Sequence, residues 1–365
     1  MTEKPNNPSD PIKPSPLEGE GWEGGEPSNE SSKDVPPTLA LPLKGGGDLE
    51  KGLTCWVLTN GMAGFETQGI GIAEALGVTP VMKRVSPPPP WKWLAPHGPA
   101  APNADVKAPW PDLLIASGRQ SIPYARMIAK ASKGRIFTVI LQNPRVAPSH
   151  FDLVWAPAHD QLSGPNVISS LVSPHRLTAE RLSAEAAKWE PKLAHLRHPR
   201  VAVLLGGSNA IYDFDEVAAA RLADQLTRLC DGGGASLMVT PSRRTGEAQT
   251  RIIKDALKDR PALVWDGTGD NPYFGFLGAA DAIIVTCDSV NMVGEAAFTG
   301  KPVHVVEMAG HSPKFRRFLD AIYAAGAARP FVGALESWEY APLNATHDIA
   351  EAIRTRFAQR HMDAT

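Results

Sequence analysis

The sequence has few cysteines and no long apolar run. Its 365 residues include three cysteines, at positions 55, 230 and 287, with no Cys-x-x-Cys pair and no histidine spacing to match. We therefore expect neither a zinc site nor a disulfide framework, and we expect a reducing compartment. The sequence contains no run of about 18 apolar residues, the length that a transmembrane helix needs. The first residues also lack the basic and apolar regions of a signal peptide. Both absences predict a cytosolic protein.

The chain also lacks a strong excess of charge of either sign. Its net charge is −2, from 37 Lys and Arg against 39 Asp and Glu. Residues 1–48 alone hold four lysines and nine acidic residues, so the remainder of the chain is at +3. Proteins that bind nucleic acid usually carry a clear basic stripe or patch. Nucleic acid is therefore not the partner that we expect.

The composition changes near residue 48. Residues 1–48 contain nine prolines, many Gly, Ser and Glu residues, and almost no apolar clustering. Such a segment buries too little apolar surface to offset its ordering entropy, which predicts a disordered tail. After it we expect an N-terminal domain (49–190), a C-terminal domain (191–335) and a last helical segment (336–365) that packs back on the N-terminal domain.

Short apolar runs alternate with helix-like stretches in both domains. We predict strands at 55–58, 81–85, 113–116, 137–141, 153–155 and 167–171, and a second series at 201–205, 236–240, 263–265, 282–286 and 303–306. This alternation is typical of parallel sheets covered by helices on both faces. The predicted fold class is α/β, with two doubly wound Rossmann-like domains facing a cleft between the carboxyl ends of their strands, where such folds bind ligands.

One segment interrupts this rhythm. Residues 86–111 contain nine prolines together with Trp91, Trp93 and Trp110. We expect a stiff excursion there rather than a sheet element. Its tryptophans could contact an acceptor substrate or a membrane surface. Packing back on the domain is the alternative that we favour.

The strand-end loops of the C-terminal domain hold the residue types that bind a diphosphate. The strand 282–286 leads into a helix whose start, at Asp288 and Ser289, offers N–H groups and the positive end of the helix dipole. Glu295, further along that helix, could accept hydrogen bonds from ribose hydroxyls. An ordinary strand–turn–helix unit explains the same stretch about as well.

Three further loops of this domain also join the end of a predicted strand to a helix. The pair Gly206-Gly207 permits close backbone approach to a phosphate. Ser242-Arg243-Arg244-Thr245 suits a diphosphate better than it suits a buried turn, although a solvated basic loop is the alternative. Asn271-Pro272-Tyr273 could contact a base, and it is also a good helix start.

The N-terminal domain contributes a glycine-rich turn and two arginines. The turn, residues 60–68, matches neither a Rossmann fingerprint nor a P-loop. Glu66 in this turn could remove a proton from an acceptor, or it could simply be the charge of a first helical turn. Arg119 and Arg145 lie at strand ends, where an anionic acceptor could dock.

Two signals for a metal are weak. Asp213-Phe214-Asp215 has the D-x-D pattern of some sugar transferases, but N-capping of the following helix explains it more simply. The histidines lack ligand spacing. We therefore predict no metal site.

Together these segments resemble a known family. TNGMAGFETQGIGIAEALG, ASGRQS, LQNPR, PHRLTAERL, LLGGSN, TPSRRT, NPYFGFLGAADAIIVTCDSVNMVGEA and the KPVHV strand are similar to the mitochondrial-fission ELM proteins and their bacterial relatives. The resemblance covers roughly residues 53–358, and the combination is specific although each segment alone is not. The family resembles GT-B glycosyltransferases and nucleotide-sugar epimerases in fold.

The resemblance implies a nucleotide-sugar donor held by the C-terminal domain and an acceptor held by the N-terminal domain. The donor residues would be Gly207, Ser242, Arg243, Arg244 and Thr245 at the diphosphate, Asn271 and Tyr273 near the base, and Asp288, Ser289, Asn291 and Glu295 around phosphate and ribose. The acceptor would pass Glu66, Gln68, Arg119 and Arg145. GT-B enzymes usually need no bound metal, and no cofactor is expected.

The sequence thus predicts a metal-independent glycosyltransferase that acts on an envelope or lipid-linked acceptor, with a peripheral contact at the inner face of a membrane as an option. Arg244 would stabilise the departing diphosphate and Glu66 would be the general base. Two alternatives stay open: a non-catalytic adaptor of the mitochondrial-fission type on the same fold, and a nucleotide-sugar epimerase.

Overall fold

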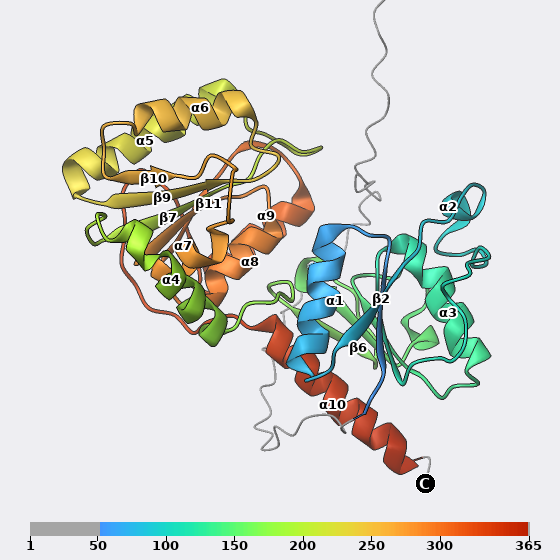
Figure 1. The fold of residues 1–365 in the computed structure, drawn as a ribbon. Helices are drawn as coiled ribbons and strands as arrows, with labels where there is room; N and C mark the ends of the chain where they lie inside the picture. Colours follow the sequence, from blue (N-terminus) through green and yellow to red (C-terminus); the bar gives the residue numbers. More distant parts are fainter. Residues whose placement is uncertain (1–51, 364–365) are drawn as a thin grey trace, which may run out of the picture. The chain divides into compact units, whose positions relative to one another are not determined.

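Two six-stranded parallel sheets form the framework of the described chain (Figure 1). The structure is a computed structural model and describes residues 52–363. The predicted tail, residues 1–48, lies outside the described residues. The prediction of an α/β protein with two doubly wound sheets is confirmed for the described part of the chain.

The N-terminal sheet has the strand order β2-β1-β3-β4-β5-β6. Its strands are β1 (Cys55–Thr59), β2 (Pro80–Arg84), β3 (Leu113–Ser117), β4 (Phe137–Leu141), β5 (Leu153–Pro157) and β6 (Val167–Ser170). Every residue of β1, β3, β4 and β5 is buried, as expected for parallel strands covered on both faces. The main covering helices are α1 (Ala63–Ala75) and α3 (Ile122–Ala131).

The C-terminal sheet has the order β10-β9-β7-β11-β12-β14. Its strands are β7 (Arg200–Leu205), β9 (Ser236–Pro241), β10 (Ala262–Val264), β11 (Ala282–Thr286), β12 (Val303–Val306) and β14 (Arg329–Pro330). The helices between them are α5 (Glu216–Gly233), α6 (Glu247–Ala256), α7 (Tyr273–Ala279), α8 (Val290–Phe298) and α9 (Pro313–Ala324). The chain starts in the middle of this sheet, builds outward on one side, and then returns to β11 on the other side of β7.

The structure adds short strands that the sequence did not predict. A two-stranded antiparallel sheet joins β8 (Tyr212–Asp213) to β13 (Ala309–Gly310). The D-x-D pattern therefore spans a strand and a cap, since the Asp215 carboxylate accepts a hydrogen bond of 2.7 Å from the Ala218 N–H at the start of α5. The N-cap interpretation is confirmed for Asp215.

Two long helices connect distant parts of the chain. The helix α4 (Ala179–Leu193) packs on α7. The last helix, α10 (Ala345–Asp363), contacts α1, and its Phe357 ring meets Phe137 of β4 edge to face at 5.6 Å. At its start, the Thr346 hydroxyl accepts a hydrogen bond from the His175 N–H and donates one to the His175 carbonyl, both at 2.8 Å.

The proline-rich excursion is only partly packed on its domain. Trp91 and Trp110 pack against a core beneath them, and Trp110 meets Trp56 of β1 edge to face at 6.0 Å. Packing back is therefore confirmed for these two tryptophans. Trp93 of the short helix α2 (Trp91–Leu94) is 71% exposed instead.

Among residues 52–363, no helix is both apolar enough and long enough to cross a bilayer. The same residues hold no cluster of three or more His, Cys, Asp or Glu side chains that could bind a metal ion.

Candidate functional site

The candidate site lies at the point where the strand order of the C-terminal sheet reverses, between β7 and β11. The connection after β7 leads to β9 on one side of this strand pair, and the connection after β11 leads to β12 on the other side (Figure 1). Ligands of open α/β sheets bind at such a switch point. The loops that begin at Gly206 and Cys287 follow these two strands, and the loop that begins at Ser242 follows β9 beside them.

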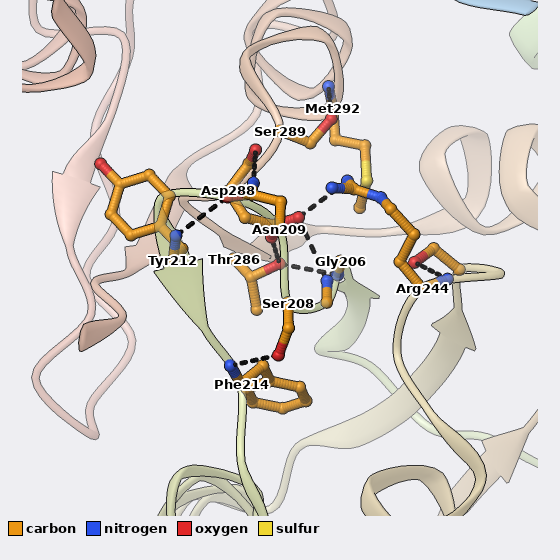
Figure 2. Close-up of polar contacts among 12 residues, drawn as sticks. Gly206, Ser208, Asn209, Tyr212, Phe214, Arg244, Thr286, Asp288, Ser289 and Met292 are labelled. Carbon is orange, nitrogen blue, oxygen red and sulfur yellow. Dashed lines mark hydrogen bonds and ion pairs between the residues drawn. The ribbon is translucent and has the colours of Figure 1, made fainter. Parts of the chain in front are cut away.

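The Asp288 carboxylate is the centre of this loop cluster (Figure 2). Its Oδ2 accepts hydrogen bonds from the Gly207 N–H at 3.1 Å and from the Arg244 Nη2 at 2.8 Å. Its Oδ1 accepts one from the Thr286 hydroxyl at 2.7 Å, and the oxygen of that hydroxyl accepts one from the Gly206 N–H at 2.7 Å. The Asp288 side chain has no solvent exposure. One buried carboxylate therefore ties together the loops after β7, β9 and β11.

The two glycines allow this packing. A Cβ atom at Gly206 would lie 1.9 Å from Asp288 Oδ1, and one at Gly207 would lie 1.9 Å from the Arg244 carbonyl oxygen. Both distances are far below van der Waals contact. The groups that approach these two glycines closely are therefore the protein's own, namely the Asp288 carboxylate and the Arg244 backbone.

The Ser242–Thr245 loop is ordered by its own side chains. The Thr245 hydroxyl oxygen accepts a hydrogen bond from the Ser242 N–H at 2.8 Å, and the hydroxyl donates to the Leu205 carbonyl at 3.0 Å. The Ser242 Oγ accepts one from the Arg244 N–H at 3.2 Å. Ser242 and Thr245 thus shape the turn that presents the two arginines. Arg243 is exposed, and Arg244 extends to Asp288 with its side chain 45% exposed.

The start of α8 borders the same cluster. Ser289 caps the helix, because its Oγ accepts a hydrogen bond from the Met292 N–H at 3.3 Å (Figure 2). The first N–H groups of a helix have no intrahelical acceptor, and those of Val290 and Asn291 come next to Ser289. Asn209, from the loop after β7, donates to the Asp288 carbonyl at 3.3 Å.

Glu295 and Tyr273 form a second polar pair in this domain. The Tyr273 hydroxyl donates a hydrogen bond of 2.6 Å to Glu295 Oε2, joining α7 to α8. Burial raises the pKa of the Glu295 carboxyl to about 7, although the Tyr273 hydrogen bond and the nearby Arg181 guanidinium oppose the rise. Burial likewise raises the pKa of Tyr273 well above its usual value. Asn271 serves the start of α7, since its Oδ1 accepts from the Tyr273 N–H at 3.0 Å.

The predicted acceptor residues of the N-terminal domain all have partners of their own. Arg84 binds the Glu66 carboxylate with two hydrogen bonds, of 2.6 and 3.1 Å, and this contact holds the pKa of Glu66 below its usual value. The Arg119 guanidinium donates to two backbone carbonyls near α2. The Gln68 side-chain oxygen accepts from the Gln142 amide at 3.2 Å. Arg145 lies in the loop after β4, where its N–H donates to Asn143 Oδ1 at 2.9 Å.

The structure thus brings together one set of the predicted site residues through direct contacts: Gly207, Ser242, Arg244, Thr245, Asp288. Tyr273 and Glu295 form a separate hydrogen-bonded pair. Sequence reasoning missed Thr286, Asn209 and Arg181. Thr286 had a weak signal, as a hydroxyl ending an apolar strand beside Asp288. Arg181 had none, because its approach to Glu295 depends on the packing of α4 against α7.

Comparison with known proteins gives a family and several relatives. A family model described as Mitochondrial fission ELM1 matches residues 63–357. The chain is 33% identical over 279 residues to the mitochondrial fission protein ELM1 of Arabidopsis thaliana, an alignment covering 68% of this chain and 65% of that protein. An uncharacterized protein of Rickettsia prowazekii (strain Madrid E) is 26% identical over 284 residues, covering 67% of this chain and 79% of that one. The chain therefore spans slightly less than two thirds of the length of the Arabidopsis relative.

Solved structures with some likeness to this chain have low sequence identity. A UDP-GlcNAc 2-epimerase from Methanocaldococcus jannaschii aligns with a TM-score of 0.48 and 10% identity, covering 83% of this chain and 98% of that one. The MurG protein of Acinetobacter baumannii aligns with a TM-score of 0.45 and 14% identity, covering 86% and 94% of the two chains.

Proposed function

The chain belongs to the Mitochondrial fission ELM1 family, and we propose that it is a glycosyltransferase. It would move a sugar from a nucleoside-diphosphate sugar to an envelope or lipid-linked acceptor without a metal ion. The donor would bind at the carboxyl edge of the C-terminal sheet, and the acceptor would come from the side of the N-terminal domain.

One observation carries this proposal: Arg244 and the start of α8 meet at the β7/β11 switch point. Arg244 contacts Asp288, which directly precedes the capping residue Ser289, so the guanidinium is held near the first turn of α8. The positive end of a helix and a guanidinium both favour a diphosphate. Arg243, the neighbouring residue, is exposed and adds a second positive charge.

These groups would supply the positive charge that stabilises the departing diphosphate. In the transfer, the bond between the sugar C1 and the diphosphate oxygen breaks, and the acceptor oxygen forms a bond to C1. The diphosphate leaves with the bonding electrons, and Arg243, Arg244 and the start of α8 would stabilise its charge. Ser289, Asn291 and Glu295 on α8 would contact phosphate and ribose, and Asn271 and Tyr273 would lie near the base.

The acceptor hydroxyl must also lose its proton. Glu66 was predicted as the base, and its ion pair with Arg84 keeps it ionised but lowers its affinity for a proton. Since a general base works best with a pKa near the working pH, this contact would have to loosen when the acceptor binds. The roles of Glu66 as base and of Arg119 and Arg145 as acceptor contacts stay predictions.

A second candidate is a non-catalytic adaptor on the same fold. The Asp288 carboxylate already accepts hydrogen bonds from Gly207 and Arg244, two donors that a diphosphate would use. A loop cluster whose donors already bond to the protein's own carboxylate could have a purely structural role. The name of the Arabidopsis relative refers to mitochondrial fission and not to sugar transfer.

The first experiment is thermal unfolding with a panel of UDP, GDP, ADP, CMP and their sugars. Ligand at roughly 100 times its Kd should stabilise the native protein by about 2.7 kcal/mol. We expect a shift with one nucleotide class for the wild type and for Arg221→Ala, an exposed arginine of α5 that serves as matched control. We expect no shift for Arg244→Ala. Once a donor is known, Arg244→Ala should also lower turnover by about ten- to a thousandfold.

Two outcomes would redirect the proposal. A flat panel with well-folded protein would favour the adaptor, and an unchanged Arg244→Ala variant would remove this arginine from the site. Product analysis with the donor but without any acceptor then distinguishes the epimerase alternative, because an epimerase would convert the donor sugar alone.

A further inference from the structure

The helix α2 exposes two apolar side chains. Trp93 is 71% exposed and Leu94 is 49% exposed, whereas Trp91 at the start of the same turn packs inward. In Figure 1, α2 lies at the margin of the N-terminal domain, away from its sheet. A tryptophan exposed to this degree is unusual, since large aromatic side chains are mostly buried.

The backbone beneath these side chains is held in place by two arginines. Arg119 donates hydrogen bonds to the carbonyls of Ala95, at 3.0 Å, and of Lys92, at 3.3 Å. Arg126 donates to the His97 carbonyl at 3.2 Å. The exposure of Trp93 is therefore a property of an ordered turn. A partner would bind it with little further loss of conformational entropy.

The segment around α2 is also basic. The proline-rich segment 86–111 contains two lysines, Lys92 and Lys107, and a single acidic residue, Asp105, in a chain whose net charge is −2. Lys107 is exposed, and Lys92 stands between the two tryptophans of α2 in the sequence. This surface therefore favours an anionic partner.

We propose that α2, with Trp93 and Leu94 as its apolar contacts and Lys92 beside them, docks on an anionic lipid bilayer. Tryptophan is enriched at the membrane–water interface, and lysine beside it is attracted to anionic headgroups. A stable protein partner would bury about 800 Å² on each side, and a single helical turn with two exposed apolar side chains offers much less. A bilayer needs no such area, because apolar side chains and basic residues each add to its binding.

The test is flotation of the full-length chain with vesicles of phosphatidylcholine, with and without phosphatidylglycerol. We expect binding to the vesicles that contain phosphatidylglycerol, weakening as salt is added. Trp93→Ala should lower the partition coefficient by about tenfold or more, because it removes most of the apolar contact. Lys92→Gln should lower it about fivefold, and only for the anionic vesicles.

Val217→Ala is the matched control, because Val217 is 68% exposed but belongs to α5 of the other domain. It should bind vesicles as the wild type does. Loss of binding in Trp93→Ala with retention in Val217→Ala supports the proposal. A wild type that floats with neither vesicle at low salt, or a Trp93→Ala variant that floats as well as the wild type, overturns it. Lipid binding is measured without nucleotide or acceptor, so this result is independent of glycosyl transfer.

Discussion

At the residue scale, two carboxyl groups of the C-terminal domain, those of Asp288 and Glu295, differ in their hydrogen-bond partners. Asp288 accepts hydrogen bonds from a backbone N–H, a hydroxyl and a guanidinium, and so joins three loops. Glu295 has one neutral donor, the Tyr273 hydroxyl, and its burial favours the protonated form near neutral pH. The first carboxylate organises loops, whereas the second can change its charge in the physiological range.

Glu295→Gln should change how stability depends on pH. The folded protein has a Glu295 pKa of about 7 against the ordinary 4.5, so between these values the folded state holds a proton that the unfolded chain has released. Stability from this group is therefore present at acid pH and lost as the pH rises through about 7. Glutamine keeps an oxygen acceptor for Tyr273 but cannot ionise. We expect the variant to be more stable than the wild type above neutral pH, by about 3 kcal/mol.

The measurement is urea unfolding of both proteins at about pH 5 and pH 8. Tyr273→Phe is the companion variant, because it removes the hydrogen bond that favours the charged form of Glu295. The pH at which stability falls should move upward in that variant. Equal pH dependence for Glu295→Gln and the wild type would show that Glu295 does not titrate in this range.

At the scale of elements, the strand-end loops of the C-terminal domain depend on backbone packing as well as on side chains. The Arg244 carbonyl fills the space above Gly207, and the Asp288 carboxylate fills the space above Gly206. The sequence suggested glycines that admit a phosphate, and the same absence of a side chain admits a neighbouring loop. The two uses are indistinguishable in the sequence, because both need only a missing Cβ.

Gly207→Ala should therefore destabilise the domain. Its Cβ would meet backbone atoms of Arg244, which cannot rotate away, so the two loops must separate. We expect a loss of about 1–3 kcal/mol in the free energy of unfolding, as for other overpacked sites. Thermal or urea unfolding measures it.

Gly232→Ala provides the control for this prediction. Gly232 lies in α5, and a Cβ there would meet nothing within 4 Å. That variant should gain up to about 1 kcal/mol, because alanine is the better helix former. A Gly207→Ala variant as stable as the wild type would mean that the loops can separate freely.

At the scale of the whole molecule, the last helix packs against the N-terminal domain. The helix α10 follows the C-terminal sheet in sequence, yet its Phe357 lies against Phe137 and its Arg360 donates to the Ile136 carbonyl at 3.1 Å. Arg360 also pairs with Asp152 at 2.6 Å. The core of the N-terminal domain thus includes residues from the last helix.

Phe357→Ala should destabilise the protein by about 3 kcal/mol, since it removes a buried aromatic side chain from that core. Met362→Ala, on the same helix but 65% exposed, should change stability little. Urea unfolding compares the two. If both variants matched the wild type, α10 would contribute nothing to the stability of the N-terminal core.

The fold class, most strands and helices, and the position of the candidate site residues at strand ends could be predicted from the sequence alone. These follow from hydrophobic periodicity and from turn and capping residues, which act over a few neighbouring positions. The unit from β11 to α8 is an example, since its strand, cap and helix are contiguous in the chain. The same local rules explain why Asp215 was recognised as a cap.

The partner of each of these residues could be read only from the folded chain. Asp288 meets Gly207 and Arg244 from 81 and 44 positions away, and Glu66 meets Arg84 from the next strand. The folded chain also shows that Trp91 packs inward while Trp93 faces outward. Contacts of this kind depend on strand order and on how loops pack around a shared edge. Nothing in the spacing of residues along the chain encodes them locally, so they appear only when the sheet is assembled.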